Sequence, residues 1–506
     1  MKHTHPHNKT EVKALKKIIV IGSGYGGVTA AALLQKSGCS VTLLEAAAEW
    51  GGCAGKFQRR KFVFPVGATL AMGLNNDSIH GKINRFLEIN VEAFRLSTVM
   101  DVTVNNETIK YYSNKESFLQ MWRKKLPASA DKVEAFFREV WFLSAILQKH
   151  MNEFPVIYPH TYQETAALLR GMSRNSLRLL PLRNKSFKYM LKKHGLTEEY
   201  MLREFLDNVL MDSLQTTSDK CSLLMGAAAL DIYHEDAWYI EGGHYRLIEK
   251  MIESLKDNGG QVLKPRKALE VEKNGKMWSV KDHRGNVHEA EHVILNMPLS
   301  NAEKILNEKD RSSLKKKLRY AVSDREQWGA FSLYFGIKDV MGENAPLFQQ
   351  FTAGENSLSD SSHFFVSASA SEDRRRAPEG HRSLTISTHV DLKNWSTKEM
   401  YDKKSSKLKQ QVKSRLEKAY PGFQDSIVYE ITGGPSAWER FTLRMDGGVG
   451  GFPQIPGYSL TDAVSHRSGI KGLWICGDTV FPGAGSIGAA SSGVHTARSI
   501  LKRRIL

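Results

Sequence analysis

The alternation of apolar and polar positions becomes regular at Ile18, where four apolar residues in a row predict a strand buried on both faces. A glycine-rich turn follows, then an apolar stretch at helical spacing, and Val41–Leu44 forms a second apolar run. Residues 18–45 are therefore predicted to form a strand, a tight turn, a helix and a second strand. This unit begins many doubly wound α/β domains.

Three glycines in the turn have the spacing of a dinucleotide-binding fingerprint. Gly22, Gly24 and Gly27 stand in the order G-x-G-x-x-G between the predicted strand and helix. The first permits the turn, the second lets the backbone approach a pyrophosphate, and the third lets helix and strand pack closely. Glu45 ends the second strand, where an acidic side chain accepts hydrogen bonds from ribose hydroxyls. We therefore expect the helix N-terminus to hold the phosphates of a dinucleotide.

Patterns beyond residue 75 predict a second domain that interrupts the first. Apolar residues recur mainly at helical spacing from about Ile79 to Ala228, and residues 245–296 return to a helix, a β meander and a buried strand. Gln327–Ile337 and Arg382–Val390 read as strands of a second sheet, and Trp395–Tyr420 reads as a long helix. The predicted fold is α/β, with a Rossmann-like domain formed by residues 1–75, 236–300 and 440–506 and a discontinuous α+β substrate domain formed by residues 76–235 and 301–439.

The stretch from residue 472 to residue 493 is the second informative segment. Gly477 and Asp478 follow a short apolar strand, and a helix of small residues is predicted from about residue 486. Its N-terminus, near Gly485, carries about half a positive charge and suits the anion that develops on a reduced flavin. Gly483, Gly485 and Gly488 also match G-x-G-x-x-G. We do not expect a second dinucleotide site there, because a polar loop separates these glycines from their strand and no strand with a terminal acid follows.

The dinucleotide is suggested by a resemblance. Glu45 is followed after five residues by Gly51-Gly52. This extension resembles the FAD fingerprint of glutathione-reductase-like and amine-oxidase-like flavoproteins, which implies FAD and a domain of the glutathione-reductase type. Gly51 and Gly52 join the expected cofactor-binding residues on this basis.

Nearly the whole chain resembles the bacterial-type phytoene desaturase family, which includes carotenoid desaturases, carotenoid isomerases and retinol saturases. The motifs that carry the resemblance are Gly242-Gly243, Asp373–Gly380, Glu439–Thr442 with Gly450-Gly451, and Gly472–Asp478. The resemblance implies that Glu45 binds the adenosine ribose, that Asp478 contacts the flavin side, and that the substrate is a long apolar polyene. Phytoene itself is disfavoured, since Phe481-Pro-Gly-Ala-Gly stands where phytoene desaturases have His-Pro-Gly-Gly-Gly.

The implied activity is FAD-dependent oxidation of a carotenoid or related polyene. Desaturation of C–C to C=C needs a hydride acceptor, which flavin N5 provides, and a weak proton acceptor. His244 and Glu439 are weighed as that acceptor and are as readily structural, so the catalytic residues are left unassigned. Cis-trans isomerisation and retinol-saturase-like reduction are the alternative reactions. The electron acceptor is left open between a quinone and oxygen.

The composition of the chain is strongly basic. The 506 residues include 71 Lys and Arg against 54 Asp and Glu, which gives a formal charge of +17. A basic nucleotide-binding scaffold is the non-enzyme alternative, but no aromatic stacking platform is apparent and nucleic acid is not expected. The polar opening Met1–Lys13 lacks a signal-peptide core, no apolar run is long enough to span a membrane, and the four cysteines lack metal-like spacing. A cytoplasmic protein without a metal is expected.

The basic residues gather between Arg170 and Lys193. This stretch holds eight Lys and Arg, no acid and several interleaved apolar residues. It is predicted to dock on an anionic membrane, at the inner face of the cell membrane, with Leu179, Leu180, Leu182 and Phe187 entering the acyl boundary. A solvated helix face over the core is the equally weighted alternative.

Overall fold

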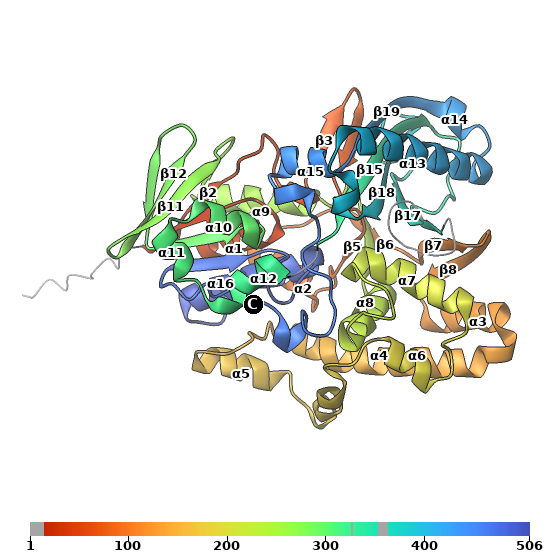
Figure 1. Ribbon diagram of the computed structural model, residues 1–506, viewed down its shortest axis with the longest axis horizontal. Helices are drawn as coiled ribbons and strands as arrows, with labels where there is room; N and C mark the ends of the chain where they lie inside the picture. Colours follow the sequence, from red (N-terminus) through yellow and green to blue (C-terminus); the bar gives the residue numbers. More distant parts are fainter. Residues whose placement is uncertain (1–14, 325–326, 353–362) are drawn as a thin grey trace, which may run out of the picture.

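A computed structural model describes residues 15–324, 327–352 and 363–506. The polar opening Met1–Lys13 lies outside these residues. The chain forms two main sheets with helices around them (Figure 1). No helix in the described ranges is long and apolar enough to cross a membrane.

The first sheet is parallel and holds the predicted fingerprint. Its strands run in the order β10-β2-β1-β14-β20 and pair in parallel. The order places the fingerprint strand β1 at the centre, where both faces are covered and a continuous apolar run is stable. The strands are β10 (Gln261–Leu263), β2 (Ser40–Leu44), β1 (Lys17–Ile21), β14 (His292–Asn296) and β20 (Leu473–Cys476).

Helices α1 (Tyr25–Lys36), α16 (Gly485–Leu501) and α9 (Arg246–Asp257) pack together on one face of this sheet. The contact of α1 with α16 is close because both helices carry small residues: a Cβ on Gly493 would lie 2.4 Å from the carbonyl oxygen of Gly26. The antiparallel strands β11 (Ala268–Asn274), β12 (Met277–Asp282) and β13 (Val287–Ala290) lie on the other face and confirm the predicted meander. Helices α10 (Leu299–Ile305), α11 (Glu308–Ser312) and α12 (Lys316–Asp324) follow; α10 and α12 share that core.

The second sheet has seven strands in the order β19-β15-β18-β17-β16-β7-β8. Strands β15 and β18 confirm the two predicted strands, and β16 pairs with β7 in parallel. The strands are β19 (Ile427–Gly433), β15 (Gly329–Lys338), β18 (His381–Val390), β17 (His363–Ala368), β16 (Phe348–Thr352), β7 (Thr98–Val104) and β8 (Glu107–Tyr112). The prediction that residues 79–228 are largely helical is wrong at β7 and β8, whose β-branched residues alternate around the Asn105-Asn106 turn.

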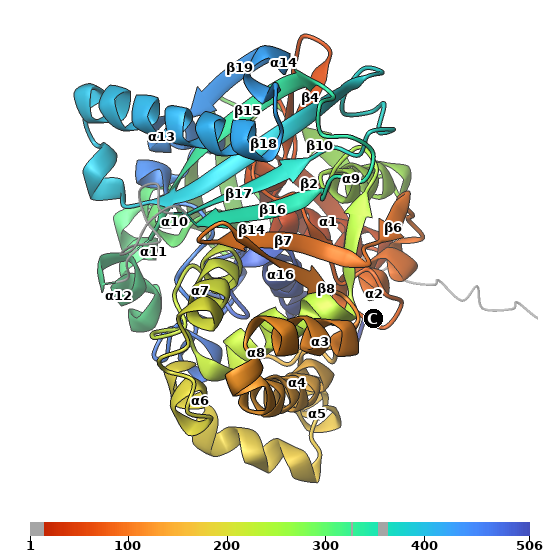
Figure 2. The same ribbon diagram turned by 90° about the vertical axis from the view of Figure 1, so that its right-hand side faces the viewer.

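Helices cover both faces of the second sheet (Figure 2). The predicted long helix is α13 (Lys398–Ala419), which packs Leu408, Val412 and Leu416 against β15 and β18. Helix α7 (Tyr200–Leu214) packs on β7 and β16 on the other face, and α8 (Leu223–Glu235) joins it to α4 (Ala130–Met151) and α3 (Lys115–Lys125). These helices and β7 and β8 share one large aromatic core.

Short sheets and several short helices complete the fold around the two main sheets. The short sheets are β3 (Lys56–Arg59) with β4 (Phe62–Pro65), and β5 (Ala71–Met72) with β9 (Ala237–Ile240) and β6 (Ala93–Arg95). The other helices are α2 (Ile79–Leu87), α5 (Tyr162–Arg170), α6 (Lys188–Lys193), α14 (Phe423–Ser426) and α15 (Pro435–Thr442), with 3-10 turns at η1 (Gly52–Ala54), η2 (Pro127–Ser129), η3 (Arg174–Leu182), η4 (Leu392–Trp395), η5 (Met445–Gly447) and η6 (Leu460–Asp462). The division into domains at the predicted boundaries stays a prediction.

The prediction that Leu179 and Phe187 enter a membrane is wrong. Phe187 is fully buried and Leu179 is 8% exposed, because both pack in the helical core beside α4 and α8. Leu182 is half-buried, whereas Leu180 is exposed as predicted. The segment is also not a single amphipathic helix, since η3 and α6 are short and separated by a turn.

Candidate functional site

The turn between β1 and α1 is packed too tightly for a side chain at Gly22 or Gly27. Gly22 has φ +99°, and a Cβ there would lie 2.4 Å from the backbone oxygen of Asn296. A Cβ on Gly27 would lie 2.1 Å from the carbonyl oxygen of Gly22, which is far inside van der Waals contact. Gly24 is the N-cap of α1, so the free N–H groups of the helix begin at this turn. The turn therefore has the geometry of a phosphate-binding loop.

Asn296 fixes this loop from the neighbouring strand, at the carboxyl end of β14. Its Nδ2 donates to the carbonyl oxygens of Gly22 at 3.1 Å and Gly24 at 3.2 Å. The signal for this role in the sequence is weak: Asn296 ends a predicted buried strand, and polar residues at strand ends gather where α/β sheets bind ligands.

Glu45 lies at the end of β2 and is only 8% exposed. One carboxylate oxygen accepts from the backbone N–H of Ser23 at 2.9 Å and from its Oγ at 2.5 Å, and the other accepts from the N–H of Ala47 at 2.8 Å. Ser23 Oγ in turn accepts from the N–H of Gly51 at 3.0 Å. The carboxylate is thus held in one orientation, and its remaining lone pairs suit two ribose hydroxyls.

The glycine pair after β2 opens toward the same space. Gly51 and Gly52 have φ +101° and +54°, and a Cβ on Gly52 would meet no atom within 4 Å. Burial raises the pKa of the neighbouring Cys53 thiol, so this thiol stays protonated at neutral pH.

The C-terminal segment reaches the same site from β20, the edge strand next to β14. Gly477 follows β20 with φ +113°, and its N–H donates to Ser492 Oγ of α16 at 2.8 Å. Asp478 pairs with Arg444, whose Nη2 lies 2.9 Å from Asp478 Oδ2. Gly485 begins α16 with φ +82°, and a Cβ there would also meet nothing within 4 Å. Arg444 lies between the motifs Glu439–Thr442 and Gly450-Gly451 but belongs to neither, and the sequence does not show that this segment meets Asp478.

A cavity of about 1160 Å³ unites these groups. Eight of the nine predicted residues line it, whereas Gly27 serves the packing of α1 instead. The volume exceeds the roughly 300–1,000 Å³ of a typical small-molecule site, which leaves room for a second ligand beside a dinucleotide. The phosphate loop, the oriented carboxylate and the two open glycines fit FAD: the start of α1 would hold its phosphates, Glu45 would hold its ribose, and Asp478 and α16 would lie on its flavin side.

The cavity lining formed by Gly22, Gly24, Glu45, Gly51, Gly52, Gly477, Asp478 and Gly485 is called the flavin cradle below. Beyond the cradle the cavity wall is largely apolar. It is formed by the end of α4, by α8 and by strands of the second sheet. The apolar side chains that contribute are Leu147, Met151, Leu214, Met225, Ala228, Ala229, Ile232 and Phe365. Such a wall suits a ligand that is poor in polar groups.

The two candidate proton acceptors lie in different environments. His244 is 1% exposed, lines the cavity, and has no hydrogen-bond partner for either ring nitrogen among the described residues. Burial, assisted by His80, lowers the pKa of His244 to about 3, so its imidazole is neutral and a weak base at neutral pH. Glu439 is exposed at the cavity rim, where it accepts from the N–H of Asp446 at 3.4 Å. Both stay candidates in the cavity without an assigned role.

Known proteins share this architecture. A sequence profile described as "Flavin containing amine oxidoreductase" matches residues 25–501. Prolycopene isomerase 1 of an Oncidium hybrid cultivar is 26% identical over 509 residues, which covers 95% of this chain and 83% of the relative. A 4,4'-diapophytoene desaturase (4,4'-diapolycopene-forming) of a Methylomonas species is 23% identical over 385 residues, which covers 73% and 72% of the two chains.

A solved structure, an oxidoreductase from Methanosarcina mazei, superposes with a TM-score of 0.63 at 15% identity and covers 96% of this chain and all of its own. That likeness concerns the fold, whereas the profile spans nearly the whole sequence. A nucleotide-binding scaffold without redox activity does not agree with these matches. The chain belongs to the flavin containing amine oxidoreductase family, and it is an enzyme, an FAD-dependent oxidoreductase.

Proposed function

We propose that this oxidoreductase acts on a carotenoid or a related long polyene and desaturates a C–C bond to C=C. The observation that carries the proposal is the apolar cavity that continues directly from the flavin cradle. The names of the relatives point the same way, since they describe a prolycopene isomerase and a diapophytoene desaturase. We also infer that the cofactor domain is of the glutathione-reductase type, which the parallel sheet with its inserted meander supports.

The protein contributes orientation and exclusion of water. FAD, when bound, supplies a hydride acceptor at N5. Apolar side chains of α4 and α8 hold an extended hydrocarbon in one register and keep water away from its reacting carbons. With FAD bound, the N-terminus of α16 would stabilise negative charge on the flavin side, and Arg444 holds Asp478 in place by an ion pair.

Product masses test this proposal directly. The gene is expressed beside different carotenoid precursors, and products are analysed by mass and by absorption spectrum. Loss of two hydrogens identifies a desaturase, which is the expected result. Gain of two hydrogens identifies a saturase, and an unchanged mass with a shifted spectrum identifies an isomerase. No change in any polyene, from protein that carries FAD, contradicts the proposal. Protein with Glu45→Ala serves as the flavin-deficient control.

We propose in addition that the enzyme works at the inner face of the cell membrane and docks there through residues 158–193, called the docking surface below. Helix α5, η3 and α6 form the lower edge of the molecule in both views (Figures 1 and 2). Large apolar side chains are unusually exposed there: Tyr158, Tyr162, Leu169, Met172, Leu177, Leu180 and Tyr189. An exposed apolar group of this kind marks an interaction site.

Basic side chains surround this apolar group. Arg170, Lys188 and Lys193 have acidic partners. The other five have no acidic partner within 4 Å in the described ranges: Arg174, Arg178, Arg183, Lys185 and Lys192. Such cations are available to anionic lipid headgroups. The surface also adjoins the cavity, because Ser176 of η3 bonds His150 at the end of α4 at 2.7 Å, and Met151 lines the cavity.

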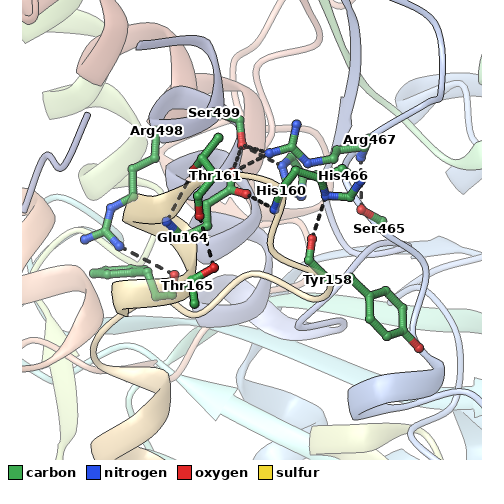
Figure 3. A network of polar contacts seen from close by, with 11 residues as sticks. Tyr158, His160, Thr161, Glu164, Thr165, Ser465, His466, Arg467, Arg498 and Ser499 are labelled. Carbon is green, nitrogen blue, oxygen red and sulfur yellow. Dashed lines mark hydrogen bonds and ion pairs between the residues drawn. The ribbon is translucent and has the colours of Figure 1, made fainter. Parts of the chain in front are cut away.

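A buried network ties the docking surface to the cofactor domain (Figure 3). Glu164 of α5 is 5% exposed and pairs with Arg467. It also accepts from Ser499 Oγ of α16 at 2.8 Å and from the N–H of His160 at 2.8 Å. Helix α16 therefore supports the flavin at its N-terminus and holds the docking surface near its C-terminus.

Liposome sedimentation tests docking. Arg178→Gln, Arg183→Gln and Lys185→Gln together should weaken binding to anionic vesicles roughly 100-fold, at about 1 kcal/mol for each charge. FAD content should not change, since none of the three side chains lines the cavity. The matched control replaces Lys398, Lys403 and Lys407 on the exposed side of α13 by Gln. Equal losses in the two variants, or no loss in the first, would contradict the docking proposal.

We propose a quinone or oxygen as the electron acceptor, since both reach a membrane-bound enzyme. Anaerobic turnover with and without an added quinone separates the two. Turnover that needs oxygen even when quinone is present identifies oxygen.

A further inference from the structure

One part of the cavity wall is polar, which an apolar polyene does not require. Asp212 of α7, Gln350 of β16 and His389 of β18 line it, and His363 of β17 packs beside them. Strand register brings the last three together, because Gln350 pairs with Phe365 and Phe365 pairs with Ser387. Residues two positions along from a pair share its face, so Gln350, His363 and His389 all face α7. These four residues and Gln215 are called the Asp212 cluster below.

Asp212 is the centre of the cluster. Its Oδ1 lies 3.0 Å from His363 Nε2 and 3.6 Å from His389 Nδ1, and its Oδ2 accepts from Gln350 Nε2. The two imidazole rings are stacked with centroids 5.8 Å apart. Burial opposes ionisation, but the two histidines outweigh it and lower the pKa of Asp212. Burial lowers the pKa of His389 to about 4, so that ring is neutral at physiological pH.

Three polar atoms of the cluster have no hydrogen-bond partner among the described residues: Gln215 Oε1, Gln350 Oε1 and His389 Nδ1. Their residues all line the cavity. Buried polar atoms are almost always paired in folded proteins, and a hydrocarbon offers them neither a donor nor an acceptor. An alcohol offers both.

We propose that the Asp212 cluster binds a hydroxyl group on the substrate, so that the enzyme takes an oxygenated polyene in preference to the hydrocarbon. The inference rests on the proposed polyene function. The hydroxyl donates to Gln350 Oε1 and accepts from a ring N–H of His389, while Asp212 and His363 hold these two side chains in place. The substrate is thereby fixed at one end, which sets the carbon that lies at the flavin.

A metal ion is the competing occupant, since ligand atoms of Asp212, His363 and His389 lie within 4.8 Å of one another. Two features favour the alcohol. Both oxygens of Asp212 already accept hydrogen bonds, from His363 and Gln350. Two of the three unpaired atoms are amide oxygens, which match an O–H donor.

The test uses lycopene and 1-hydroxylycopene, which differ only by hydration at one end. Affinity for the FAD-loaded enzyme is measured by quenching of protein fluorescence, and turnover is followed by product mass. The wild type should bind the alcohol at least about tenfold more tightly, because buried polar groups discriminate strongly against a ligand that leaves them unpaired. His389→Leu and Gln350→Leu should each bring the ratio of the two affinities to about one and leave hydrocarbon binding intact.

Thr352→Val is the matched control. Thr352 shares the sheet face and accepts from Asn208 Nδ2 at 2.6 Å, but it does not line the cavity, so the ratio should stay at its wild-type value. Gln350→Leu tests the proposal if His389→Leu fails to retain FAD.

The outcomes separate this proposal from the polyene function. Equal affinity of the wild type for both polyenes, with turnover of the hydrocarbon, overturns the hydroxyl site alone. Failure of both polyenes to bind overturns both proposals. One equivalent of zinc or iron in purified wild type, lost in His389→Leu, overturns the hydroxyl site in favour of a metal centre.

Discussion

The flavin cradle and the substrate wall meet in one cavity, but different atoms form them. The cradle is mostly backbone: Gly22, Gly52, Gly477 and Gly485 line it with main chain, and each has a positive φ that other residues rarely adopt. The wall consists of side chains from α4, α7, α8 and the second sheet. Backbone geometry admits almost no substitution, whereas a side-chain surface is reshaped by single replacements. The comparison teaches that one cofactor site can be kept while the substrate site changes.

The largest effect is expected when carbon atoms are added to each region, which tests whether the cradle tolerates less change than the wall. Gly27→Val should abolish FAD binding and much of the folded protein, because its Cβ would lie 2.1 Å from the oxygen of Gly22, which is backbone and has no room to move. Ala229→Val, on the α8 wall, should retain FAD and alter only the polyene profile. Visible flavin absorbance and circular dichroism check both. Normal FAD content in Gly27→Val would show that the cradle is not rigid.

A smaller effect is expected where the cradle does use a side chain. Glu45→Ala removes a buried carboxylate and its contacts with ribose, which are charge-assisted and contribute on the order of 3 kcal/mol. The Kd for FAD should rise roughly 100-fold. Titration of deflavinated protein by flavin fluorescence measures this change. Met225→Leu, a volume-conserving change in the wall, provides the comparison and should leave this Kd unaltered. An unchanged Kd in Glu45→Ala would rule out the ribose role.

The smallest effect is expected in the pH dependence of the free energy of unfolding. This measurement tests whether the two regions unfold together. Burial lowers the pKa of His80, near the cradle, and of His389, in the wall, to about 4 each. Below the ordinary value of about 6.5 the unfolded chain takes up protons that the native protein refuses, so stability falls as pH drops from about 6.5 toward 4. Each group contributes at most about 1.4 kcal/mol per pH unit.

Replacing either histidine by Asn should therefore reduce by up to one the number of protons taken up on unfolding. The free energy of unfolding should then fall less steeply as the pH drops. Urea unfolding at several pH values measures this slope. Equal flattening in the two variants is expected for a single cooperative unit. An effect of only one replacement would mean that the cradle and the wall unfold separately.

The sequence predicts the part of the cradle formed by residues 22–52 well because its residues are close together in the chain. Gly22, Gly27, Glu45 and Gly51 lie within thirty residues of one another, so their spacing alone defines the geometry. Asn296 was missed because nothing near it in sequence shows that β14 lies beside β1. The pairing of strands far apart in the chain is set by tertiary packing.

The wall is harder to predict for the same reason. The Asp212 cluster draws on four separate elements whose register appears only when the second sheet forms. The β7–β8 hairpin is different, since its signal was present: Asn105 and Asn106 adopt φ +48° and +68° between alternating strands. Helical patterns on both sides obscured it.

The contact between Glu164 and Ser499 joins residues 335 positions apart. At a synthesis rate of about 5–20 residues per second, Ser499 leaves the ribosome roughly twenty to seventy seconds after Glu164. During that time α5 has no α16 to pack against, and its apolar side chains have no fixed surface to present. The docking surface that we propose is therefore completed only after the last part of the flavin site has been synthesised.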